Sequence, residues 1–144
     1  MHSTVQKLII IENKIKSNLE DLKINNLPKI IAVSKTFKLD KILPLIDYGH
    51  IDFGENKIQE AVDKWTDIKE KNTNIQLHMI GKLQTNKVKL AVKLFDYIHS
   101  VDSEKLAKKI ADEQNKINKK IKIFLQVNIG DENQKSGINK NDVK

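Results

Sequence analysis

Apolar residues along the chain alternate between helical spacing and short continuous runs. Spacings of three and four residues, typical of one helix face, occur over residues 4–24, 40–48, 58–68, 88–95 and 106–117. Between them lie short apolar runs typical of buried strands, at residues 29–34, 50–53, 75–80, 97–101 and 121–129. Because five strands alternate with helices, the pattern predicts an α/β fold with a parallel sheet built from right-handed βαβ units.

Local signals predict where the first helices begin and end. Ser3 and Gln6 have the spacing of a capping box, and Asn25-Asn26 are expected to end the first helix. Pro44 is expected near the first turn of the second helix, where a missing amide costs least, and Gly49 is a suitable C-terminal stop. The run 121–129 is the longest strand candidate.

Polar residues and glycines follow the predicted strands. Gly54, Gly81 and Gly130 each come just after one. Ligands of parallel α/β folds bind beyond the carboxyl ends of the strands. We therefore expect one shared surface for the residues Lys35, Glu55, Asn56, Lys82 and Asn133. None of these loops matches a GxGxxG or Walker pattern, so neither a Rossmann nor a P-loop function is supported.

Lys35 is the candidate for covalent chemistry. It closes an apolar strand, so its amine is expected at the mouth of the sheet. A desolvated amine near a like charge, such as Lys38, keeps the neutral form that attacks an aldehyde. The alternative from position alone is a lysine that simply extends into solvent. For His78 a hydrogen-bonded core role is favoured over acid–base chemistry. Asp52 and Glu55 could form an acid–base pair, but they are expected to be solvated charge partners, as loop carboxylates near lysines usually are.

Composition narrows the function classes. The 144 residues suit a single domain, residues 1–144, and the absence of cysteine excludes disulfides and thiolate metal sites and fits a cytoplasmic location. The net charge is +7, but all 26 basic residues are lysine. Without arginine, and with few aromatic residues, a nucleic-acid or membrane-surface role is disfavoured. The apolar run at residues 8–11 is too short for a signal peptide or a membrane span.

Five motifs resemble, in order and spacing, those of the YggS-like pyridoxal phosphate homeostasis proteins. They are AVSKT at 32–36, FGENKIQE at 53–60, HMIGKLQTNK at 78–87, HSVD at 99–102, and QVN at 126–128 followed by KSG at 135–137. The resemblance implies a (β/α)8 barrel like the N-terminal domain of alanine racemase. It also implies that pyridoxal 5'-phosphate (PLP) is held as an aldimine on Lys35 and that Asn56 lines the cofactor.

Such proteins are regarded as PLP carriers without established turnover, so the resemblance implies no enzyme activity and makes apo PLP-dependent enzymes candidate partners. The alternatives are a PLP-dependent amino-acid racemase or decarboxylase fragment and a nonfunctional truncated homologue. Two departures stand out. Leu77 and Met79 replace the aromatic residues that usually flank His78. A full barrel needs about 200 residues or more, so only about the first five βα units are expected here.

The resemblance places the loops that hold the cofactor phosphate on three further strands. We therefore expect weaker PLP binding than in a chain extended by those strands. The run 121–129 would be an unpaired edge, with Ile123, Leu125 and Val127 on one side and Phe124 on the other. Unpaired backbone groups and exposed apolar area at such an edge predict self-association.

Overall fold

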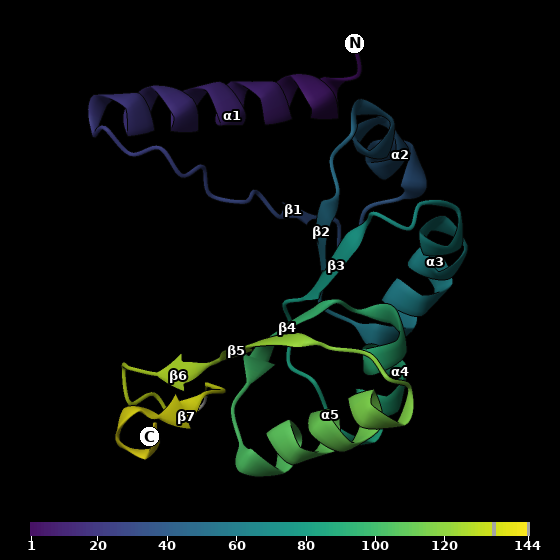
Figure 1. Cartoon of the computed structure of the whole chain (residues 1–144), viewed down its shortest axis with the longest axis vertical. Helices are drawn as coiled ribbons and strands as arrows, with labels where there is room; N and C mark the ends of the chain where they lie inside the picture. The colour runs from purple at the N-terminus through teal and green to yellow at the C-terminus, as the bar shows by residue number, and fades with distance from the viewer. Residues whose placement is uncertain (134, 144) are drawn as a thin grey trace.

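Five parallel strands form one sheet in the order β1-β2-β3-β4-β5 (Figure 1). The computed structural model describes residues 1–133 and 135–143. The strands are β1 (Ala32–Val33), β2 (Asp52–Glu55), β3 (Gln76–Met79), β4 (Tyr97–Val101) and β5 (Lys122–Leu125). The expected α/β class with alternating strands and helices is therefore confirmed, and β1 and β5 are the two edges of this sheet.

Helices connect the strands and lie together on one side of the sheet (Figure 1). They are α2 (Leu39–Tyr48), α3 (Ile58–Lys71), α4 (Val88–Leu94), which is preceded by the 3-10 turn η1 (Thr85–Lys87), and α5 (Glu104–Lys116). The first helix, α1 (Ser3–Asp21), lies beyond the β1 edge and packs against α2. No helix among residues 1–133 and 135–143 is long and apolar enough to cross a lipid bilayer.

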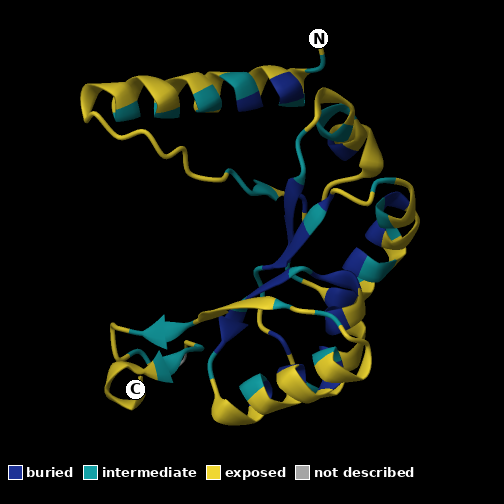
Figure 2. Cartoon of the chain, in the orientation of Figure 1, coloured by how far each residue is buried: buried dark blue, intermediate teal, exposed yellow. Residues whose placement is uncertain are grey.

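The core lies between the sheet and helices α3 to α5 (Figure 2). The amphipathic face of α3 buries its apolar residues Ile58, Ala61, Trp65 and Ile68. Trp65 packs against Phe53 of β2, with ring centroids 4.9 Å apart. Truncating a buried aromatic residue of this kind costs about 3–5 kcal/mol, so the β2–α3 contact is a main source of stability. It also fixes α3 beside the carboxyl end of β2.

The ends of two helices differ from the sequence-based expectation. The N-cap of α1 is His2, whose Nδ1 accepts a hydrogen bond from the Thr4 N–H, so the predicted Ser3–Gln6 capping box is wrong. The helix also ends at Asp21, before Asn25-Asn26. Pro44 lies inside α2 rather than in its first turn, because α2 already begins at Leu39. The predicted stop at Gly49 is confirmed, with a left-handed φ of +103°.

The two edge strands differ most from their predictions. The predicted buried strand 29–34 is reduced to Ala32–Val33, and Val33 is exposed because β1 has a neighbour on one side only. The predicted strand 121–129 is divided between β5 and a second sheet, formed by β6 (Val127–Asn128) and β7 (Ile138–Asn139). Gln126 joins the two sheets, because its N–H donates to Val101 O while its own carbonyl accepts from the Ile138 N–H.

Candidate functional site

Lys35 lies directly beyond β1, at the carboxyl edge of the sheet. Its own side chain is exposed, so the expected desolvation of its amine is wrong and the alternative of a lysine that extends into solvent agrees with the structure. The preceding residue, Ser34, is buried. The Ser34 N–H donates to Gly54 O at 2.9 Å, which extends the β1–β2 pairing by one residue. The Ser34 hydroxyl donates to Glu55 Oε1 at 2.9 Å. The strand end that carries Lys35 is therefore fixed to β2 by both backbone and side chain.

The residue that follows Lys35 adopts a rare conformation. Thr36 has a φ of +65°, in the left-handed region that a β-branched residue rarely enters. Its N–H donates to Glu60 Oε1 of α3 at 2.7 Å. This contact holds the pKa of Glu60 below its usual value, with a smaller contribution from Lys64. The turn after β1 is thus anchored to a charged group of α3.

Glu55 is buried inside the protein, so the expectation that it is a solvated charge partner is wrong. Its Oε1 accepts hydrogen bonds from Ser34 Oγ, from Lys64 Nζ at 2.9 Å and from Trp65 Nε1 at 2.8 Å. Its Oε2 has no hydrogen-bond partner among the described residues. The reason is geometric: Glu55 and Phe53 alternate onto the same face of β2, and that face packs against α3.

Asn56 follows Glu55 and lies against the loop after β3. A Cβ added to Gly81 would be 2.5 Å from Asn56 O and 2.8 Å from its Cα, so only glycine allows this approach. Asn56 Oδ1 is buried and has no partner among the described residues. Asn56 and Lys82 line one pocket, together with Lys57 and Lys87. The structure therefore brings two of the predicted site residues together.

Asn133 does not join this group. It lines a separate pocket around β6 and β7, with Asn128, Asp131, Gly137 and Asn139. The expected single surface is therefore wrong for Asn133, because the chain leaves the main sheet at Gln126. Gly54 also differs from its expected place after a strand, since it lies within β2, where it pairs with Val33 and His78.

A histidine network occupies the sheet face opposite the helices, and the sequence reasoning did not find it. His78 is 2% exposed; its Nε2 is 2.9 Å from Asp52 Oδ1 and its Nδ1 is 2.9 Å from His99 Nε2. The hydrogen-bonded core role expected for His78 is thus confirmed. Asp52 is buried rather than solvated, so that expectation is wrong. Burial lowers the pKa of His99, and the neighbouring His78 lowers it further.

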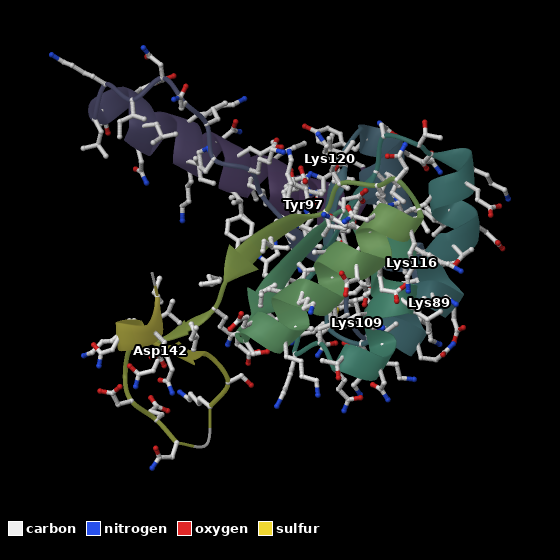
Figure 3. All side chains as sticks on the ribbon, turned by 60° about the horizontal axis from the view of Figure 1, so that its bottom comes forward. Lys89, Tyr97, Lys109, Lys116, Lys120 and Asp142 are labelled. Atoms are coloured by element: carbon white, nitrogen blue, oxygen red, sulfur yellow. The ribbon has the colours of Figure 1, made fainter. Side chains whose placement is uncertain are left out.

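Tyr97 stacks on His78, with ring centroids 4.2 Å apart, and extends away from the face of α5 that carries Lys109 and Lys116 (Figure 3). Its hydroxyl is 3.3 Å from both Lys29 Nζ and Lys122 Nζ. Hydrogen bonds from these two ammonium groups lower the pKa of Tyr97. Alternation along β3 and β4 would have predicted that His78 and Tyr97 face away from the helices, but not that they meet.

Comparison with known proteins agrees with this architecture. The family described as "Alanine racemase, N-terminal domain" matches residues 10–144. A pyridoxal phosphate homeostasis protein of Haemophilus influenzae is 38% identical over 133 residues, which cover 91% of this chain and 56% of that protein. The chain spans about half the length of the curated relatives it matches.

Two solved structures are similar over most of this chain. PipY of Synechococcus elongatus, solved with PLP bound, has a TM-score of 0.70 at 34% identity, covering 87% of this chain and 58% of PipY. An unknown protein from Bifidobacterium adolescentis has a TM-score of 0.83 at 27% identity, covering 94% of this chain and 59% of that one.

Parallel strands, alternating helices and polar groups collected beyond the strand ends define an α/β protein of the barrel class. Within that class, the chain belongs to the alanine racemase N-terminal domain family, in its YggS/PipY group of pyridoxal phosphate homeostasis proteins.

Proposed function

We propose that this chain binds PLP, with Lys35 as the covalently bonded residue and Asn56 as a lining residue, and serves intracellular PLP homeostasis without catalytic turnover. The relatives are named for PLP homeostasis, and PipY is described with PLP bound. In this function residues 1–144 act as one domain in the cytoplasm. Apo PLP-dependent enzymes are its proposed recipients.

The observation that carries the proposal is the place of Lys35. Its exposed side chain follows β1, at the edge where Asn56 follows the neighbouring strand β2. The buried, unpartnered Oδ1 of Asn56 supports a binding role, because such an atom gains a hydrogen bond when a donor on a ligand reaches it. An unpartnered amide oxygen at the same edge of the sheet as Lys35 therefore supports binding of a polar ligand there.

The chemistry expected at this edge is simple. When bound, the cofactor supplies an aldehyde carbon with which a neutral amine condenses, with loss of water. Lys35 supplies the amine, and the anchored residues Ser34 and Thr36 restrict the directions that its side chain can take. Asn56 orients the ligand through its amide.

Borohydride trapping tests this proposal. The chain is incubated with PLP, reduced, digested, and the modified lysine is mapped by mass spectrometry. We expect the label on Lys35 and its loss in Lys35→Ala. The control variant Lys108→Ala, which removes an exposed lysine of α5, should keep the label. Label spread evenly over the 26 lysines would contradict the proposal. Racemisation or decarboxylation of amino acids that disappears in Lys35→Ala would show an enzyme instead.

A further inference from the structure

Both neighbours of Lys35 in the chain are bound by side chains of one helix. On one side, Lys64 Nζ of α3 donates to the carbonyl oxygen of Ser34 at 2.9 Å. On the other side, Glu60 of α3 accepts from the Thr36 N–H. The backbone is therefore held immediately before and immediately after Lys35, while the Lys35 side chain itself remains exposed.

The two α3 side chains are also bound to each other and to the buried carboxylate. Lys64 Nζ is 3.3 Å from Glu60 Oε1 and 2.9 Å from Glu55 Oε1. An ammonium group has three donors, and those of Lys64 have three oxygen partners: Ser34 O, Glu55 and Glu60. The Lys64 side chain is only 10% exposed, so solvent screens this network little.

Glu60 is not needed for packing of the core. Its side chain is 31% exposed, and the apolar face of α3 is formed by other residues, among them Ala61 and Trp65. What Glu60 does hold is the left-handed Thr36. A strained backbone persists only where its surroundings determine it, and such strain collects at functional sites.

We infer that Glu60 and Lys64 are positioning residues for Lys35. They form a clamp across the turn after β1 that keeps the Lys35 amine directed toward an aldehyde ligand at the carboxyl edge. The inference rests on the proposed function of Lys35, but the clamp itself is a property of this chain's own contacts. The polar face of α3, next to Trp65, thereby positions the backbone around Lys35.

Trypsin tests the clamp without any cofactor, because it cleaves after Lys35 only when this turn opens. Cleavage of a transiently open segment follows the equilibrium between closed and open forms. Glu60→Ala removes a hydrogen bond to a charged acceptor, so we expect cleavage after Lys35 to accelerate about tenfold. Glu60→Gln retains an acceptor oxygen, so its cleavage rate after Lys35 should lie between those of Glu60→Ala and the wild type. The matched control is Glu70→Ala, which removes an exposed carboxylate from the same helix. Trypsin should cleave this variant after Lys35 at the wild-type rate.

Covalent trapping then tests whether the clamp serves Lys35. With PLP and borohydride, we expect Glu60→Ala to label Lys35 several-fold more slowly than the wild type or Glu70→Ala, with partial rescue in Glu60→Gln. Fluorescence of Trp65, the single tryptophan, verifies that each variant is folded.

Three outcomes separate the inference from the proposed function. Cleavage after Lys35 that is unchanged in Glu60→Ala would overturn the clamp. Faster cleavage with an unchanged labelling rate at Lys35 would overturn the positioning role. Labelling of Lys35→Ala by PLP to the same extent as the wild type would refute the proposed function. The trypsin result would still decide whether the clamp exists.

Discussion

Gly81→Ala tests the close approach between the loops that follow β2 and β3. A Cβ at position 81 would be 2.5 Å from Asn56 O, 2.8 Å from its Cα and 2.8 Å from its Cβ. Two of these three atoms belong to the backbone, so the contact cannot be relieved by rotation of a flexible side chain. One of the two loops must move.

The cost follows from two opposing terms. Forcing an additional carbon into a packed region typically costs about 1–3 kcal/mol. Replacing glycine by alanine also restricts the unfolded chain, which offsets about 0.4–1 kcal/mol where the native backbone suits alanine. We therefore expect Gly81→Ala to lower the free energy of unfolding by about 1–2 kcal/mol.

Urea denaturation followed by the fluorescence of Trp65 measures this loss. Trp65 is fully buried and donates to Glu55, next to Asn56, so its emission reports the part of the fold that would be disturbed. Gly130→Ala is the control, because the three nearest atoms to its added Cβ all belong to the flexible Glu132 side chain, the closest being Oε1 at 3.4 Å. A Gly81→Ala chain as stable as the wild type would refute the reasoning. We also expect slower labelling of Lys35 by PLP in this variant, since Asn56 would be displaced.

Two further predictions concern pH and self-association. The pKa of His99 is lowered in the folded state, mainly by burial and to a smaller extent by His78. Between the folded and unfolded pKa values, the unfolded chain therefore binds more protons at this residue than the folded chain does. The free energy of unfolding should therefore fall as pH drops below about 6.5 toward the folded pKa of His99. His99→Gln should reduce the difference between the urea midpoints measured at about pH 7.5 and about pH 5.5. An equal difference in the variant and the wild type would contradict this prediction. At the β5 edge, Phe124 and Leu125 are 52% and 48% exposed, so we expect self-association that makes the sedimentation coefficient rise with concentration. Phe124→Lys should reduce this concentration dependence. The control Leu90→Lys, at an exposed position of α4, should leave it unchanged. Wild-type sedimentation as a monomer at every concentration would contradict the second.

The inner strands could be located from the sequence, although β2 (Asp52–Glu55) begins and ends two residues later than the predicted 50–53, whereas the edge strands could not. β4 was predicted with its bounds, because a strand with neighbours on both sides and helices over one face has a clear apolar pattern. The same pattern was misleading at residues 29–34 and 121–129, where apolar residues are equally dense. A run of apolar residues indicates that burial is favourable, but it does not say whether a neighbouring strand is present to bury it.

The candidate site shows the same limit for charged residues. The positions of Lys35 and Asn56 after strands predicted their place at the carboxyl edge of the sheet. Glu55 was expected in solvent, because loop carboxylates near lysines are usually solvated charge partners. The strand was predicted to end at residue 53, whereas β2 extends to Glu55, and alternation along β2 places Glu55 on the same core face as Phe53. A carboxylate at such a position requires a cation and donors nearby. Lys64 and Trp65 provide them, but which helix lies over β2, and at what rotation, depends on packing against Phe53. The extent of β2 therefore shows that Glu55 needs partners, and only the tertiary arrangement identifies them and connects them to the backbone around Lys35.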